Sequence, residues 1–152
     1  MTDKPDLNAR IIDEFRANQG QVGGGFSGAP LLLLHTVGAR SGKPRVNPTM
    51  YLADKDRFLV FASKAGSDRN PDWYHNLLAH PEVRIEVGDA IIDVRAVELR
   101  GAERDTAFAE QARRYPGFAD YQSKTERVIP VIALIPLGEG AESADGTERT
   151  PV

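Results

Sequence analysis

The residues best suited to chemistry in this sequence are three basic side chains within one short stretch. Arg40, Lys43 and Arg45 lie in residues 38–51, GARSGKPRVNPTMY, which contain no carboxylate although the chain has a formal net charge of −3. Gly42 lets backbone N–H groups approach a ligand closely, and each arginine offers a planar pair of donors to phosphate or carboxylate oxygens. The stretch therefore predicts an anion-binding site, with a solvated turn between two strands as the alternative.

A second candidate for anion binding is the segment 63–70, SKAGSDRN, which leads directly into a predicted helix. Asn70 can cap that helix. Unpaired N–H groups and the helix dipole favour negative charge at a helix N-terminus. Because Ser63, Lys64 and Gly66 precede this terminus, we expect them to lie near an anion.

Nucleophilic and metal-dependent catalysis find little support in the residue types. The sequence has no cysteine, and its three histidines show no metal-ligand spacing. No G-x-S-x-G motif marks a nucleophilic serine. We therefore predict no metal. Cations in two loops, together with aromatic residues between 115 and 121, suit an anionic cofactor that brings its own chemistry.

Hydrophobic periodicity predicts the elements that position these residues. Helices are expected over 6–19, 71–79, 102–114 and 118–125. Strands are expected over 31–37, 46–53, 57–63, 83–87, 90–99 and 128–137. Pro48 cannot donate to a strand ladder, so it marks a bulge or an edge position. The short connections favour antiparallel pairing, and the pattern predicts an α+β fold: a mainly antiparallel, closed or half-closed barrel of about six strands with flanking helices.

The chain is expected to form one domain and to act on a small molecule. A length of 152 residues with 41% hydrophobic residues suits a single domain over 1–137, while 138–152 carry four acidic residues and no aromatic one and predict a disordered acidic tail. The absence of a signal sequence and of an apolar span predicts a cytoplasmic protein without a transmembrane segment. The negative net charge argues against nucleic acid. The amphipathic helix over 6–19 is expected to cover one end of the core, and a weak contact with a membrane surface is left open.

Three blocks of sequence, in this order, resemble the deazaflavin-dependent nitroreductase family. They are LLLLHTVGARSGKPRVNPTMYL at 31–52, ASKAGSDRNPDWYHNL at 62–77 and RYPGFADYQ at 114–122. The resemblance extends over about residues 8–137. It implies a split β-barrel and a reductase that uses reduced coenzyme F420, an 8-hydroxy-5-deazaflavin, to reduce quinones, nitroaromatics and other activated acceptors.

The resemblance also implies roles for individual residues. The phosphate and oligoglutamate tail of F420 would meet Arg40, Ser41, Lys43 and Arg45, and the phosphate and the backbone beside the ring would lie at Lys64, Ala65 and Gly66. The deazaflavin would be lined by Pro48, Thr49, Met50 and Tyr51, and the pocket would be supported by Trp73 and Asn76. The electron acceptor would lie among Tyr115, Phe118 and Tyr121, of which Tyr115 and Tyr121 are the catalytic candidates through their hydroxyls.

Two departures from the family pattern, and two alternative functions, accompany this interpretation. Ala39 occupies a position where close relatives often carry an arginine, and Phe118 one where some carry a tyrosine. An FMN-binding split-barrel oxidoreductase would share the fold and the basic loops. A non-catalytic carrier of a flavin or another small ligand is the alternative from a different class, and a homodimer is left open.

Overall fold

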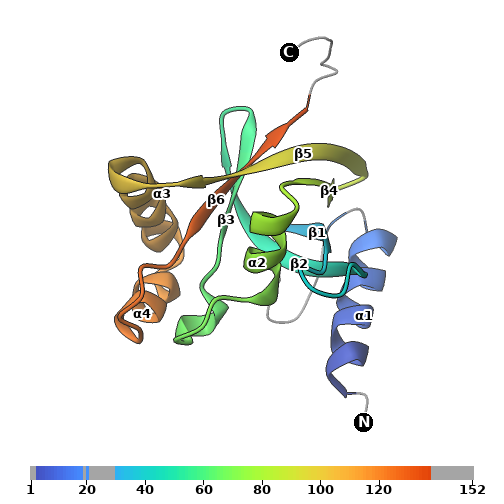
Figure 1. Cartoon of the computed structure of the whole chain (residues 1–152), viewed down its shortest axis with the longest axis horizontal. Helices are drawn as coiled ribbons and strands as arrows, with labels where there is room; N and C mark the ends of the chain where they lie inside the picture. Colours follow the sequence, from blue (N-terminus) through green and yellow to red (C-terminus); the bar gives the residue numbers. More distant parts are fainter. Residues whose placement is uncertain (1–2, 19, 21–29, 138–152) are drawn as a thin grey trace.

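The computed structural model describes residues 3–18, 20 and 30–137. The predicted acidic tail, 138–152, lies outside the described residues. Within the described part, six antiparallel strands close into a barrel in the order β1-β2-β3-β6-β5-β4 (Figure 1). The strands are β1 (Leu31–Val37), β2 (Pro44–Asp54), β3 (Arg57–Phe61), β4 (Glu82–Val87), β5 (Ala90–Leu99) and β6 (Val131–Pro136). The predicted fold class is confirmed.

Pro48 occupies an edge position and not a bulge. The register between β1 and β2 runs without interruption through Leu33 and Pro48. The Tyr51 N–H donates to the Pro30 carbonyl, so the alternation of an antiparallel pair turns the Pro48 nitrogen away from β1. On that other side β3 pairs only with Tyr51–Asp54. No described strand pairs with the first half of β2 on that side, so a residue without an N–H is tolerated there.

Four helices accompany the barrel in the described part of the chain. They are α1 (Asp3–Ala17), α2 (Asp72–Ala79), α3 (Gly101–Arg114) and α4 (Gly117–Ser123), and a 3-10 turn, η2, spans Lys64–Gly66. Figure 1 shows α3 and α4 together on one side of the barrel and α1 on the opposite side. No described helix is both long enough and apolar enough to cross a bilayer.

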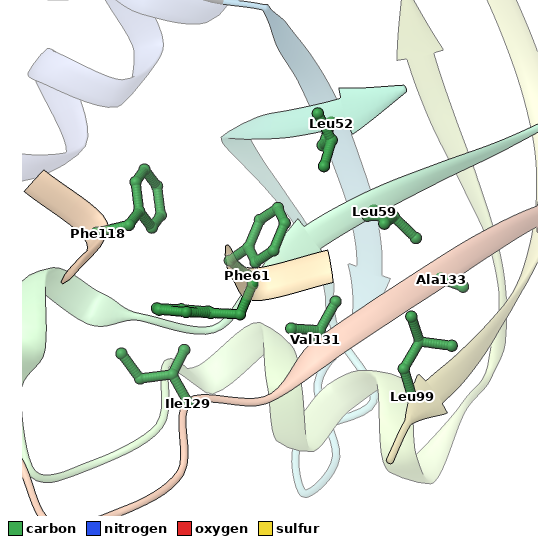
Figure 2. Packing of buried hydrophobic residues seen from close by; sticks show 9 residues of the cluster. Leu52, Leu59, Phe61, Leu99, Phe118, Ile129, Val131 and Ala133 are labelled. Atoms are coloured by element: carbon green, nitrogen blue, oxygen red, sulfur yellow. The ribbon is translucent and has the colours of Figure 1, made fainter. Parts of the chain in front are cut away.

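Buried residues form three groups that follow the two faces of the strands. β1 is buried on both faces, as its continuous apolar run predicts: Leu32 and Leu34 face the barrel interior, whereas Leu31 and Leu33 pack against Phe15 of α1. A third group, here called the outer cluster, lies between the barrel and the α3–α4 pair (Figure 2). Its members are Leu52, Leu59, Phe61, Leu99, Phe108, Phe118, Ile129, Val131 and Ala133.

Candidate active site

The basic turn, residues 38–45, joins β1 to β2 in a conformation that its own hydrogen bonds close. The Gly38 N–H donates to the Lys43 carbonyl at 2.8 Å, and the Gly42 N–H donates to the Gly38 carbonyl at 3.0 Å. Gly42 has a φ of 70°, a conformation that favours glycine. The Lys43 N–H donates to the Ser41 hydroxyl at 3.1 Å. Ser41, predicted to contact the cofactor, thus also stabilises the turn.

Asn76 of α2 holds the basic turn to the barrel. Its Oδ1 accepts from the Ala39 N–H at 2.9 Å, and its Nδ2 donates to the Thr36 hydroxyl at 3.1 Å. Asn76 is only 6% exposed, so both bonds are shielded from water. The structure therefore gives Asn76 a supporting position, and Ala39, which lacks the arginine of the resembled family, contributes its backbone N–H.

The cations of the basic turn have no carboxylate partner among the described residues. Arg40, Lys43 and Arg45 are exposed, and within the described chain the Arg45 side chain bonds only to the adjacent Pro44 carbonyl, at 3.3 Å. Other arginines do pair with carboxylates, namely Arg16, Arg57, Arg84, Arg95, Arg100, Arg104, Arg113 and Arg114. Three unneutralised cations on one fixed turn are arranged to bind an anion from solvent.

The second predicted anion site, residues 63–70, belongs to a loop that begins after β3 and is here called the 62–70 loop. This loop is organised around a residue that the sequence did not mark. The Arg127 guanidinium donates to the carbonyls of Ser67 at 2.8 Å, Ala62 at 3.1 Å and Ser63 at 2.8 Å. It also donates to Asn70 Oδ1 at 2.7 Å. Burial of this guanidinium lowers the pKa of Arg127. Its partners lie some sixty positions earlier in the chain, and no local pattern identifies them.

These bonds change the roles expected for two residues of the 62–70 loop. The Asn70 side chain does not cap α2, because it accepts from Arg127 and Pro71 occupies the cap position. The Gly66 N–H donates to the Ser63 carbonyl at 2.9 Å and is therefore already bonded. A Cβ on Gly66 would lie 2.9 Å from the Tyr121 carbonyl oxygen of α4. Glycine at position 66 thus allows α4 to approach the loop. Lys64 is exposed, with an unusual φ of 45°, and Ala65 follows it in the same 3-10 turn.

The four residues predicted to line the deazaflavin divide between the two faces of β2. Tyr51 packs in the barrel interior, with its ring 5.4 Å from that of Phe58, and Trp73 of α2 packs against the same interior group. Thr49, two residues from Tyr51, shares its face and is buried. Pro48 and Met50 point the other way, and Met50 contacts both the outer cluster and the residues under α1. Met50 is thus placed between the two outer groups of apolar residues.

The predicted catalytic tyrosines lie on the same outer cluster as Met50. Tyr115 and Tyr121 are half-buried and pack against it, and the Tyr121 ring lies 5.3 Å from that of the buried Phe118. Neither tyrosine hydroxyl bonds to another residue of the described chain. Both hydroxyls are therefore available to a ligand. Met50, Tyr115 and Tyr121 all pack against the outer cluster, whereas Tyr51 and Trp73 pack in the barrel interior.

Gln111 of α3 is a further polar residue at this cluster that the sequence did not mark. It is fully buried, and neither its Oε1 nor its Nε2 has a hydrogen-bond partner among the described residues. The only signal in the sequence is its spacing, because Gln111 falls on the same helical face as Phe108 and Tyr115. No cluster of three or more His, Asp or Glu side chains able to hold a metal occurs among the described residues.

Known proteins share this chain's sequence and fold over most of its length. A family model described as F420H(2)-dependent quinone reductase matches residues 9–136. A protein of Mycobacterium tuberculosis (strain H37Rv), F420H(2)-dependent quinone reductase Rv1261c, is 42% identical over 127 residues, which cover 79% of this chain and 83% of that protein. Putative F420H(2)-dependent quinone reductase Rv3178 from the same strain is 39% identical over 117 residues, covering 76% of this chain and 98% of the relative.

Solved structures agree with the sequence comparison. A structure titled F420-H2 Dependent Reductase (FDR-A) is 40% identical, with a TM-score of 0.64, and covers 69% of this chain and 93% of its own. A second, titled domain-swapped dimer, is 36% identical, with a TM-score of 0.65, and covers 86% of this chain and 98% of its own. The reductase class and F420 as the cofactor, both implied by the resemblance in sequence, are confirmed. The chain belongs to the F420H(2)-dependent quinone reductase family.

Proposed function

We propose that this protein reduces quinones with F420H2, and that the basic turn binds the anionic part of that cofactor. The observation that carries the proposal is the set of three exposed cations, Arg40, Lys43 and Arg45, on a turn fixed by Asn76 and without a carboxylate partner in the described chain. The reductases that it resembles support the choice of donor and acceptor.

The residues present fit the chemistry of F420. Its phosphate and oligoglutamate tail are anions, and arginine forms two charge-assisted hydrogen bonds with either kind of oxygen group. Since the three cations are free of ion pairs with the described residues, a bound anion displaces no carboxylate of that part of the chain. The exposure of this site also means that binding should weaken as salt is added.

The acceptor side is proposed to lie at Met50, Tyr115 and Tyr121, which share the outer cluster. When bound, reduced F420 supplies a hydride from C5 of its ring. The chain's own residues hold the acceptor in contact, which replaces an encounter in solution by a fixed orientation. Conversion of a quinone to a hydroquinone adds one hydride and one proton, and a tyrosine hydroxyl or a water molecule provides the proton. The same hydroxyl can stabilise the negative charge that develops on the acceptor oxygen.

Other activated acceptors, including nitroaromatics, are proposed to react at the same place. Such compounds share an electron-poor apolar ring and an oxygen on which charge develops, so the tyrosines would treat them alike. A cytoplasmic location and a homodimer complete the proposal, the latter supported by the structure titled domain-swapped dimer. Analytical ultracentrifugation of the purified protein would show the state of association directly.

The direct test titrates the purified protein with oxidised F420 and, separately, with FMN, following ligand fluorescence, and then measures oxidation of F420H2 by menadione. We expect F420 binding that salt weakens, and turnover with menadione. Tight binding of FMN without binding of F420 would favour a flavin enzyme. F420 binding without turnover of any acceptor would favour a carrier.

The tyrosine hydroxyls can be tested one at a time. Tyr121→Phe should leave F420 binding unchanged and slow menadione reduction about tenfold, because a donor to a developing oxyanion contributes a few kcal/mol to the transition state. Tyr115→Phe tests the other hydroxyl in the same way. Tyr74→Phe is the control, since its hydroxyl donates to Glu98 at 2.9 Å and lies outside the site. Parent-like turnover in both Tyr115→Phe and Tyr121→Phe would remove the hydroxyls from the mechanism.

A further inference from the structure

A groove of about 510 Å³ runs between α3 and the β2–β3 hairpin. Its lining residues are Leu52, Ala53, Asp54, Arg57, Leu59, Ala102, Glu103, Thr106, Ala107, Glu110 and Arg114. Leu52, Leu59 and Ala107 give it an apolar floor that is continuous with the outer cluster, since Leu52 and Leu59 belong to that cluster and Ala107 packs against it. Figure 2 shows Leu52 and Leu59 within that cluster, on the paired strands β2 and β3.

The charged residues at the rim of the groove neutralise one another. Arg57 lies 2.8 Å from Asp54 and 3.0 Å from Glu103, and Arg114 lies 2.7 Å from Glu110. The lining holds three carboxylates and two arginines, and the third carboxylate is balanced by Arg113 just outside the lining, which lies 2.6 Å from Glu110. The groove therefore suits an uncharged hydrophobic group better than an anion. Another hollow, of about 570 Å³, is lined by residues of both signs, including Asp68, Glu126 and Arg127, and is less suited to such a group.

One end of the groove lies next to the candidate active site, because Arg114 in its lining is adjacent to Tyr115 in the chain, although neither Tyr115 nor Met50 lines the groove. At one end, the Arg57–Glu103 pair joins the hairpin to the start of α3. At the other end, Arg114 precedes Tyr115, which packs on the outer cluster together with Met50. Met50 and Leu52 share a face of β2 because strand side chains alternate. The helical rise between Glu103 and Arg114 corresponds to a length of about 16 Å.

Gln111 does not itself line the groove but lies next to its Tyr115 end on α3. Three residues close to it on the helix, Ala107, Glu110 and Arg114, line the groove. The Gln111 amide is fully buried, with neither its oxygen nor its nitrogen bonded to a described residue. A buried amide without partners is unfavourable, so a ligand that supplies a donor or an acceptor there gains binding energy.

We propose that this groove binds the apolar substituent of a substituted quinone, and that the Gln111 amide hydrogen-bonds a ring oxygen of the quinone at the end beside Tyr115. The proposal rests on the proposed function. An amide suits both sides of the reaction, because Nε2 can donate to the carbonyl of the quinone and Oε1 can accept from the hydroxyl of the hydroquinone. The apolar chain would then extend along Leu52, Leu59 and Ala107 toward Arg57.

The groove is tested with two quinones that share one head group: 2-methyl-1,4-naphthoquinone and the same compound with a decyl chain. Binding without cofactor is measured by equilibrium dialysis, and KM and kcat are measured with F420H2. The parent should bind the decyl compound about tenfold more tightly. Ala107→Phe, which fills the groove, should abolish this preference, so that the decyl compound and the unsubstituted quinone bind with similar affinity. Ala109→Phe adds the same ring at an exposed position on α3 and should retain the preference.

A second variant, Thr106→Phe, keeps the test informative if Ala107→Phe does not fold. Thr106 is exposed and lines the groove, so Thr106→Phe narrows it without changing the buried cluster. It should lower the preference for the decyl compound while the melting temperature stays at the parent value. If folded Ala107→Phe and Thr106→Phe both keep the parent preference, or if the parent shows none, the groove assignment is wrong although quinone reduction stands. Failure to reduce either quinone would overturn the proposed function as well.

Gln111 is tested by Gln111→Met, which has a similar shape without hydrogen-bonding groups. We expect a melting temperature equal to or above that of the parent, since two unsatisfied polar atoms are removed. Binding of both quinones should weaken about tenfold. Unchanged binding of both quinones would show that the amide has no ligand contact, and would overturn its part of the proposal. The opposite movements of stability and affinity separate a ligand-binding role from a packing role.

Discussion

The basic turn and the 62–70 loop both carry cations, but they place them differently. In the basic turn, Arg40, Lys43 and Arg45 are exposed and have no carboxylate partner in the described chain. In the 62–70 loop, the decisive cation is Arg127, which comes from another part of the chain and donates to the loop's own carbonyls. Neutral hydrogen bonds thus fix the basic turn, and its three cations can bind a ligand. In the 62–70 loop, by contrast, the charged Arg127 guanidinium fixes the loop conformation.

The largest effect on stability is therefore expected from Arg127→Met. It leaves three carbonyls and Asn70 without their charged donor, and the loss should be about 3 kcal/mol, or about 10 °C in melting temperature. Arg127→Lys keeps the charge but cannot reach all four acceptors, so its melting temperature should lie between those of the parent and of Arg127→Met. Arg69→Met is the control, because the exposed Arg69 side chain lies in the same loop and makes no hydrogen bond there to a described residue. Equal melting of Arg127→Met and Arg69→Met would contradict this role.

The next largest effect, on the affinity for F420, is expected at the basic turn. Arg45→Glu should weaken F420 binding about tenfold or more, because a charge-assisted contact of about 1.5 to 3 kcal/mol is replaced by repulsion. Its melting temperature should stay near that of the parent, since Arg45 has no ion pair to lose in the described structure. Lys55→Glu reverses an exposed charge in the β2–β3 turn and should leave binding unchanged. Unaltered affinity and salt dependence in Arg45→Glu would remove the basic turn from the cofactor site.

The same contrast explains what the sequence could and could not predict. Strands β1 and β5 occur at the predicted residues because alternation and apolar runs are local signals. The basic turn could be found because its cations are adjacent in the chain. The predicted strand over 128–137 begins only at Val131, because the residues before it are bonded to the 62–70 loop and not to a neighbouring strand. Arg127 donates to the Ser67 carbonyl, and the Pro130 carbonyl accepts from the Ala62 N–H. Arg127 itself could not be predicted, since its partners are brought to it by the closure of the barrel.

The side of the site proposed for the acceptor was predictable only in part. The resemblance in sequence marked the tyrosines, and in the structure Tyr115, Tyr121 and Met50 all pack against the outer cluster. A glutamine on a helix carries no comparable signal, because most glutamines are exposed. The burial of Gln111 depends on the packing of α3 against the barrel. Its lack of a partner becomes visible only when that packing is known.

The smallest effect on stability is expected at Arg16 of α1, a cation that already forms an ion pair with a carboxylate. Its guanidinium donates to both carboxylate oxygens of Glu86 on β4, at 3.1 and 2.7 Å, and His35 Nε2 lies 2.6 Å from Glu86 Oε2. Hydrogen bonding by Arg16, and then by His35, holds the pKa of Glu86 below its ordinary value of 4.5. This contact and the burial of Phe15 both hold α1 against the barrel.

A lowered carboxyl pKa fixes the direction of the pH dependence. Glu86 stabilises the folded state while it is ionised, so its contribution is complete above pH 4.5 and is lost as the pH falls through the lower pKa of the native state. Glu86→Gln should therefore reduce stability at pH 7 by about 1 kcal/mol or less, since the Arg16 side chain is half exposed. The difference from the parent should shrink below pH 4.5. Denaturant unfolding from pH 7 to pH 3 would measure this difference in stability.

Glu82→Gln is the control, because that carboxylate pairs with Arg95 at a more exposed position of the same strand. If the difference between Glu86→Gln and the parent were constant with pH, the hydrogen bonds of Glu86 would act through packing and not through its charge.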